Sequence, residues 1–138
     1  MYSKAKKPPL YLSSHEMSNL VKNVSKDRHR LGLAIMAYAG LRVSEMCSLR
    51  IKDLHLARGF MRVTGKGGKV RIVPLSSFLQ REVEDYLTRY GASMDQDSFL
   101  LVRTRASWHY VIKKYARKHL VRDDIHCHTL RHSFATAL

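Results

Sequence analysis

The strongest helical pattern in the chain lies in residues 27–39. Leu31, Ile35 and Tyr38 recur at the spacing that places side chains on one face of a helix, and alanines widen that face. A helix this apolar is expected to be buried. Gly40 should end it, because glycine readily adopts the left-handed conformation that closes a helix.

Weaker patterns predict further helices on either side. The first should begin at Ser13 and run to about Val24, because Ser13 and Glu16 have the Ser-x-x-Glu spacing of a capping box, in which each side chain satisfies a backbone N–H group. The other helices are expected from about Ser44 to Leu49, from Ser76 or Ser77 to Tyr90, from Ser107 to about His119, and from His128 to Leu138.

Two runs rich in valine and isoleucine, Phe60–Thr64 and Val70–Pro74, predict the strands of a β-hairpin. The loop between them is rich in glycine, which can supply the positive φ angles of a tight turn. Phe99–Val102 is expected to form another short extended segment. The chain is therefore predicted to be mostly α with a small antiparallel β-hairpin or sheet, in the α+β class.

Length and composition place these elements in one domain, because 138 residues that are 45% apolar suffice for a single core. Residues 13–138 are expected to form it, after a basic arm or linker remnant at residues 1–12. No apolar run approaches membrane-spanning length, and the N-terminus lacks the apolar stretch of a signal peptide. Two cysteines give no disulfide framework, so a reducing, cytoplasmic location is expected, and no membrane partner.

The chain carries 25 Lys and Arg against 11 Asp and Glu, a formal net charge of +14. Charge alone leaves membrane surfaces and acidic proteins open as partners, but nucleic acid is the commonest partner of such a chain. Two basic blocks, each without an acid, flank one acidic helix; single blocks can be solvated faces, but two favour a surface that follows DNA phosphates. The predicted DNA contacts are Arg62, Lys69, Arg71, Arg103, Arg105, Lys113 and Lys114.

Three short strings contain residue types suited to phosphoryl transfer. An arginine fork can hold two non-bridging phosphate oxygens and stabilise the added charge of the transition state. A lysine or histidine can donate a proton to the leaving alkoxide. On a helix, the histidines and arginine of the third string share one face. The strings are Ala39-Gly40-Leu41-Arg42-Val43-Ser44-Glu45, Gly65-Lys66-Gly67-Gly68-Lys69-Val70-Arg71, and His128-Thr129-Leu130-Arg131-His132-Ser133-Phe134-Ala135-Thr136.

Each string also has a simpler interpretation. Arg42 could cap the carbonyl groups of the preceding helix, and Lys66 and Lys69 could only solubilise a turn that does not match a Walker loop. His126-Cys127-His128 offers adjacent ligands without a partner pair, so no metal or other cofactor is expected. Surface or interface positions are expected for the histidines without a shared pattern, which are His15, His29, His55, His109 and His119.

Together the three strings resemble the boxes that mark the tyrosine recombinase family, which includes phage integrases and Xer recombinases. The resemblance runs from about Tyr11 to the last residue. The first string is similar to the box around the family's first catalytic arginine. The second, with Val73-Pro74-Leu75 after it, is similar to the hairpin lysine region, and the third to the His-x-x-Arg box. One box would be weak evidence, but three in order are a specific signal.

The resemblance implies catalytic roles for Arg42, Lys66, His128 and Arg131. The two arginines would hold the scissile phosphate, and the histidine would contact it and assist proton transfer. The lysine would protonate the 5′-hydroxyl leaving group, with Lys69 as the alternative. The family needs no metal, and its members act on double-stranded DNA together with further copies of the same recombinase, so a nucleoid-associated protein is expected.

The resemblance also places a second His or Trp, and then a nucleophilic Tyr, a few tens of residues after the His-x-x-Arg box. This sequence ends seven residues past Arg131, and all seven of its tyrosines precede that box. We therefore expect a partial catalytic domain that does not cleave DNA alone and that forms a 3′-phosphotyrosyl intermediate only in a complete protein, or with a tyrosine from a neighbouring protomer. The alternatives are a non-catalytic DNA-binding protein or degenerate integrase remnant, and an RNA-binding protein.

Overall fold

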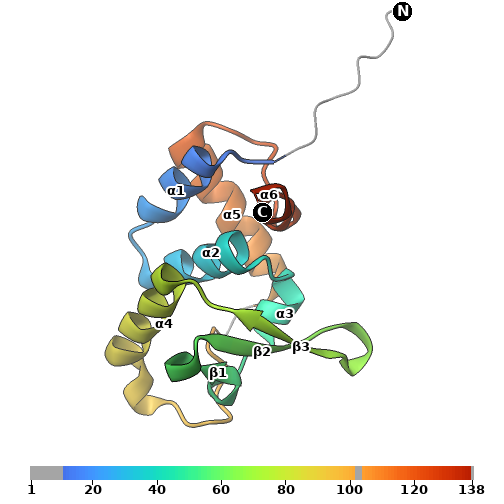
Figure 1. Ribbon diagram of the computed structural model, residues 1–138. Coiled ribbons are helices and arrows are strands. Elements are labelled where there is room, and N and C mark those ends of the chain that lie inside the picture. The colour runs from blue at the N-terminus through green and yellow to red at the C-terminus, as the bar shows by residue number, and fades with distance from the viewer. Residues whose placement is uncertain (1–10, 102–103, 138) are drawn as a thin grey trace, which may run out of the picture.

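Helix α2 (Asp27–Ala39) forms the centre of the computed structural model, which describes residues 11–101 and 104–137 (Figure 1). Nine of its 13 residues are buried. It packs against α1 (Ser14–Lys22), α4 (Ser77–Tyr90) and α6 (Cys127–Ala137). The apolar pattern of this segment thus determines the arrangement of the helical layer, because every side of α2 meets another element.

The helix α5 (Arg105–Leu120) completes this layer. It packs against α1, α6 and the short helix α3 (Val43–Cys47). Its buried residues include Trp108, which is completely shielded from solvent. The other face of α5 is basic and open to solvent, so one side of this helix holds the core together while the opposite side is free for a partner.

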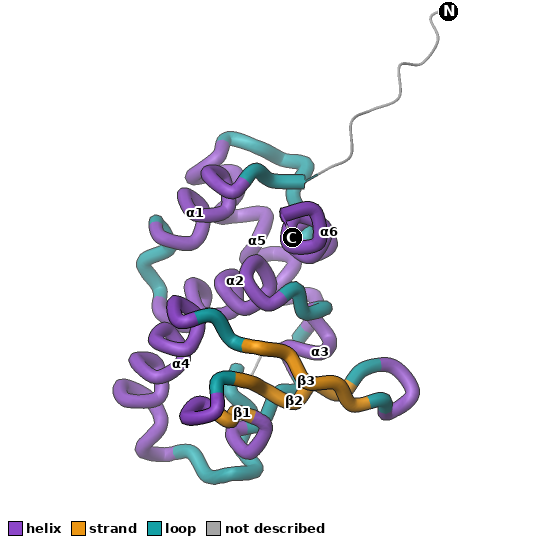
Figure 2. Tube along the Cα trace, in the orientation of Figure 1, coloured by secondary structure: helices purple, strands orange, loops and turns teal. Residues whose placement is uncertain are grey.

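A three-stranded antiparallel sheet lies beside the helices, in the order β1 (Leu54–His55), β2 (Phe60–Thr64), β3 (Val70–Pro74) (Figure 2). On β2 the buried residues alternate with exposed ones, so one face is turned to the core. The register pairs Val63 with Arg71, which places the Arg71 side chain on that same inner face. The β2–β3 hairpin extends away from the helices at its tip (Figure 1).

Several local features confirm the predictions from sequence. Ser13 and Glu16 form the complete capping box at the start of α1. Gly40 ends α2 with φ 68°, in the left-handed region. The two hairpin strands have the predicted ends, and Gly67 and Gly68 supply the positive φ angles at its tip. The fold is therefore mostly helical with a small antiparallel sheet.

Other boundaries differ from the predictions. Helix α5 begins two residues earlier than expected, because the Thr104 side chain caps it by accepting a hydrogen bond from the Ser107 N–H group. The predicted extended segment at 99–102 is reduced to a β-bridge between Phe99 and Arg50, and Val102 lies outside the described residues. The sequence pattern missed β1 and the 3₁₀ turns, which are η1 (Ile51–Asp53), η2 (Leu56–Arg58), η3 (Lys66–Gly68) and η4 (Gly91–Ser93).

The structure describes only the end of the expected N-terminal arm, because residues 1–10 lie outside the described residues. Leu12, near the end of that arm, is buried, and its N–H group donates a hydrogen bond of 2.6 Å to Ser133 Oγ on α6. His29 was expected at the surface, but it is buried with its Nδ1 atom 3.0 Å from the Tyr115 hydroxyl.

Gly32 allows α2 and α5 to pack closely, because a Cβ atom there would overlap the Trp108 ring. We predict that Gly32→Ala destabilises the protein by about 2 kcal/mol or more, since overpacking outweighs the roughly 1 kcal/mol that alanine gains in a helix. Chemical denaturation measures this. Gly91→Ala is the matched control, since its Cβ would make only ordinary contact with Leu87. Equal stability of the two variants would contradict this account of the packing.

Candidate active site

A hollow of about 240 Å³ opens where α3, α5 and α6 meet. Two of the three predicted boxes contribute to it, although they are far apart in sequence. Its described lining carries basic groups and no carboxylate. The lining residues are Arg42, Val43, Ser44, Arg105, His109, Cys127, His128 and Arg131.

Arg42 is positioned by the turn that follows α2. The left-handed Gly40 reverses the chain, and Arg42 becomes the N-cap residue of α3 in an extended conformation. Its backbone N–H group donates a hydrogen bond of 2.8 Å to Glu45 Oε1. The Gly40 turn and the first residues of α3 therefore fix the position of the Arg42 backbone, from which its guanidinium group extends.

Arg131 reaches the same turn from α6. Its Nη1 atom donates a hydrogen bond of 2.6 Å to the carbonyl oxygen of Gly40. Phe134, one helical turn further on, packs so closely that a Cβ atom at position 40 would overlap its ring. Gly40 is thus required both for its positive φ and for this close approach, which holds Arg131 beside Arg42.

Glu45 is the only carboxylate among the described residues that the structure places against this arginine pair. It is 3% exposed. Arg71 of β3 binds both of its oxygens, with 3.1 Å between Nη2 and Oε1, and Arg131 Nη1 lies 3.8 Å from Oε1. Burial alone would raise the pKa of Glu45, but the hydrogen bonds from Arg71 and Arg42 and the charges of Arg71 and Arg131 outweigh it, so the pKa is lowered. Glu45 is therefore a carboxylate at neutral pH.

The arginine pair carries more positive charge than this carboxylate balances. Burial lowers the pKa of Arg131, the positive charges of Arg42 and Arg71 lower it further, and Glu45 opposes this effect. Arginine stays protonated in spite of such shifts. Burial is the largest cause of this shift and the charge of Arg42 adds to it, so an anion in the hollow would relieve the repulsion between the two arginines.

The other predicted site residues divide into two groups. His128 is exposed and lines the hollow. Lys66 and Lys69 are exposed at the hairpin tip, and neither is among the described residues that line the hollow. The structure therefore brings together Arg42, His128 and Arg131 and leaves the lysines outside.

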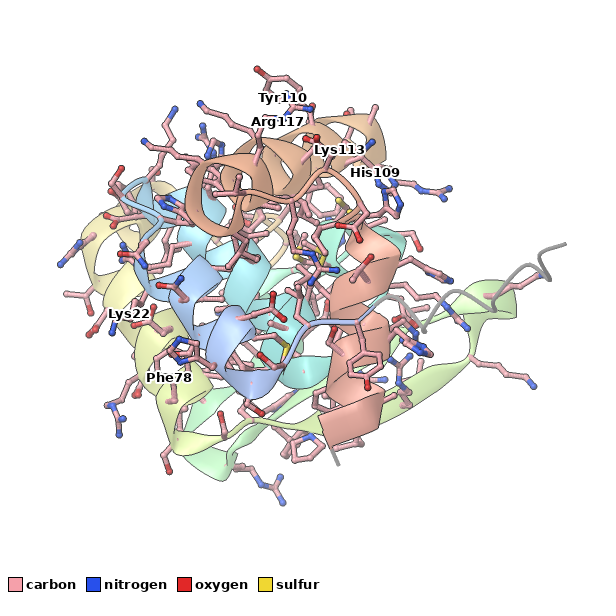
Figure 3. All side chains as sticks on the ribbon, turned by 90° about the horizontal axis from the view of Figure 1, so that it is seen from above. Lys22, Phe78, His109, Tyr110, Lys113 and Arg117 are labelled. Atoms are coloured by element: carbon pink, nitrogen blue, oxygen red, sulfur yellow. The ribbon has the colours of Figure 1, made fainter. Side chains whose placement is uncertain are left out.

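The predicted DNA contacts also differ in their surroundings. Arg62 on β2 is exposed, and so are Lys113 and Lys114 on α5. Figure 3 shows Lys113 on the outer face of α5 together with His109, Tyr110 and Arg117. Arg71 is engaged by Glu45, and Arg103 lies outside the described residues.

One residue of the hollow was not predicted from the sequence, and another was predicted only as a DNA contact. His109 lines the hollow, although it belongs to none of the three strings. Arg105, predicted as a DNA contact, lines it as well. Their spacing of four residues on a basic helix places them on one face, and this signal could have found the pair. His132 instead lies against Tyr11, with ring centroids 6.3 Å apart.

Within residues 11–101 and 104–137, no group of three or more His, Cys, Asp or Glu side chains could hold a metal ion. In the same part of the chain, no helix has both the length and the apolar character needed to cross a membrane.

Solved structures of recombinases share this fold. The crystal structure of XerA recombinase matches with a TM-score of 0.83 and 28% sequence identity, over 95% of this chain and 51% of that chain. The XerH site-specific recombinase bound to its difH substrate, in a pre-cleavage complex, matches with a TM-score of 0.79 and 26% identity, over 96% of this chain and 44% of that chain. The fold is that of a tyrosine recombinase catalytic domain.

Sequence comparison agrees with the structures. The phage integrase family matches residues 11–138. A tyrosine recombinase of Pseudothermotoga lettingae is 38% identical over 134 residues, which cover 94% of this chain and 47% of that protein. Tyrosine recombinase XerA of Pyrococcus furiosus is 36% identical over 141 residues, which cover 93% of this chain and 47% of that protein. This chain belongs to the phage integrase family of tyrosine recombinases, and it spans about half the length of the relatives it matches.

Glu45→Gln should destabilise the protein by about 2–3 kcal/mol at neutral pH, because Arg71 and Arg131 lose their buried counter-charge. The lowered pKa of Glu45 means that its contribution is present above the pKa of an unfolded glutamate and is lost as the pH falls through the folded value. The difference between parent and variant should therefore shrink in acid. Urea unfolding across the acid range measures this, with the exposed Glu84→Gln as control. A difference independent of pH would contradict the assignment.

Proposed function

We propose that this chain is the DNA-binding catalytic core of a site-specific tyrosine recombinase. In the complete protein it would cleave and rejoin DNA strands through a 3′-phosphotyrosyl intermediate. The observation that carries the proposal is the pairing of Arg42 and Arg131 in one hollow without a carboxylate in its described lining. Two guanidinium groups held together in this way fit a phosphodiester better than any neutral ligand.

The chemistry follows from the arrangement of these groups. A tyrosine hydroxyl attacks the phosphorus and releases its proton, with His128 assisting this transfer, while the bond from phosphorus to the 5′-oxygen breaks and the 5′-oxygen takes up a proton. Arg42 and Arg131 would bind the non-bridging oxygens and stabilise the charge that grows in the transition state. His128, at the edge of the hollow, would hydrogen-bond to the phosphate. Lys66 is proposed as the proton donor to the 5′-oxygen, with Lys69 as the alternative.

Lys66 must approach the hollow when DNA is bound, because it lies on the exposed hairpin tip in the free protein. A catalytic hydrogen bond that is absent from a free enzyme often forms only in the substrate complex. The tip can move toward a phosphate because Gly67 and Gly68 have open space around them. We expect any oxyanion bound by the arginine pair, whether a DNA phosphate or free orthovanadate, to draw this loop inward.

Duplex DNA is the proposed partner, bound together with further copies of the recombinase at the nucleoid. The related XerH structure is described as bound to its difH substrate. On this chain, Arg62, Lys69, Arg105, Lys113 and Lys114 would contact the phosphate backbone on either side of the hollow. No metal is needed in this mechanism, because arginine supplies the charge stabilisation.

One observation favours a second candidate function, which is DNA binding without cleavage. The described lining of the hollow contains no tyrosine. Under the main proposal the nucleophile comes from outside the 138 residues, either from a longer form of the chain or from a neighbouring protomer. A degenerate remnant would bind DNA through the same basic surface but would never form a covalent intermediate.

We predict that the 138-residue chain binds orthovanadate, a tetrahedral oxyanion that resembles phosphate. Arg42→Gln or Arg131→Gln should weaken binding about tenfold or more, because each removes charge-assisted hydrogen bonds. Calorimetric titration measures this, and Arg81→Gln, which removes an exposed arginine on α4, is the control. If all three variants bind vanadate as the parent does, the arginine pair is not a phosphate clamp.

Covalent trapping on a nicked suicide duplex separates the recombinase from the pure binder. The 138-residue chain alone should form no covalent DNA adduct, because no tyrosine is among the described residues that line the hollow. A mixture with a relative that carries the tyrosine but has lost its own catalytic arginines should form one, and Arg42→Gln in this chain should abolish it. An adduct formed by this chain alone would show that the assignment of the nucleophile is wrong, and no adduct in any mixture or lengthened form of the chain would favour the binder.

A further inference from the structure

The tip of the β2–β3 hairpin is held only at its base in the part of the chain that the structure describes. Positions 67 and 68 have no atom within 4 Å of an added Cβ, so the tip is surrounded by open space. Val70 and Ile72 of β3 are 49% and 55% exposed, and Val73 is the one buried residue of that strand. Apolar burial therefore does little to fix the loop that carries Lys66.

Arg71 supplies the attachment that the apolar residues of β3 do not. It lies opposite Val63 in the register, on the inner face of the sheet, and its guanidinium group binds both oxygens of Glu45 on α3. A bidentate pair restricts both distance and orientation, so a rotation of β3 would break it. Glu45 is buried, so water competes weakly for this carboxylate.

The first residue of the loop lies beside the same carboxylate. A Cβ atom on Gly65 would come within 3.1 Å of Glu45 Oε2. The Gly65 N–H group donates a hydrogen bond of 2.7 Å to the carbonyl oxygen of Lys69, which closes the base of the loop. Glu45 therefore adjoins the residue before Lys66, while it also accepts the N–H group of Arg42 and lies 3.8 Å from Arg131.

We propose that Arg71 is a positioning residue: by binding Glu45 it fixes the base of the lysine loop in register with the Arg42–Arg131 pair. This rests on the proposed function, since it takes the pair as the phosphate site and Lys66 as the proton donor. The basic pattern of the sequence predicts Arg71 as a DNA contact. Its two hydrogen bonds to a buried carboxylate give it a different partner.

The arrangement gives each part of the loop a separate task. The base is held against α3 by Arg71, and the glycines at the tip allow the lysine to move over the short distance that substrate binding requires. Without Arg71, the lysine would still be present and charged, but it would sample positions that do not face the arginine pair. Removal of Arg71 would therefore impair the action of Lys66 and leave the action of Arg42 and Arg131 unchanged.

Two measurements on the 138-residue chain test this. The first is hydrogen exchange of the amides in residues 65–70, in the parent, Arg71→Gln, Arg71→Lys and the control Arg81→Gln. The second is a double-mutant cycle, in which the effect of Lys66→Met on orthovanadate affinity is measured in the parent and in Arg71→Gln. A cycle reports the coupling of two residues, which a general loss of stability would not produce.

Arg71→Gln should raise loop exchange about tenfold or more while α2 stays protected, and Arg71→Lys should restore part of the protection because it keeps the charge but not the fork. Arg81→Gln should match the parent. Lys66→Met should weaken vanadate binding about threefold or more in the parent and have no further effect in Arg71→Gln.

Unchanged loop exchange in Arg71→Gln, or an equal effect of Lys66→Met in both backgrounds, would overturn the role of Arg71. If the parent binds vanadate through Arg42 and Arg131 but shows no such coupling, only this inference fails. If the parent binds no vanadate at all, the proposed phosphate site fails, and Arg71 then holds a loop without a catalytic partner.

Discussion

The candidate site depends on a carboxylate that is almost completely shielded from water. A lone buried carboxylate would be costly, and Glu45 is tolerated because cationic and N–H groups from three separate parts of the chain surround it. The same contacts determine where those parts lie relative to one another. The turn after α2, the edge strand β3 and helix α6 all contact the carboxylate oxygens of Glu45. The need to neutralise the charge of Glu45 therefore sets the geometry of the site.

The excess of positive charge around Glu45 also has a physical origin in the fold. Arg42 and Arg131 approach each other because Gly40 permits both a left-handed turn and close packing of Phe134. Packing and hydrogen bonds to the backbone thus offset the repulsion between the arginines. Under the proposed function, a bound phosphate would relieve the repulsion that remains between the two arginines.

The sequence predicted the parts of this molecule that depend on local rules. The capping box at Ser13, the helix end at Gly40 and both hairpin strands follow from short-range chemistry, and they are present as expected. The two-residue strand β1 was missed because so short a segment has no periodicity. The burial of His29 was missed because it depends on Tyr115, which lies 86 residues away.

The same distinction applies to the site. The strings around Arg42 and Arg131 could be found in the sequence, and the structure brings these two residues to one hollow. The pairing of Arg71 with Glu45 could not be found, because it requires knowledge of which elements pack together, whereas the spacing of Arg105 and His109 was a signal that the motifs left unused. The pattern of charges along the sequence predicted Arg71 as a phosphate contact. That pattern does not show that Glu45, 26 residues away in sequence, lies beside Arg71 in the fold.

The hydrogen bond between Arg131 and the Gly40 carbonyl closes a loop of 91 residues. Contacts between residues so far apart form late in folding, since the chain entropy of closing the loop has to be overcome first. During synthesis Arg42 leaves the ribosome long before α6 exists. In a nascent chain the hollow between α3, α5 and α6 is therefore incomplete, and it forms only when α6 docks against α2.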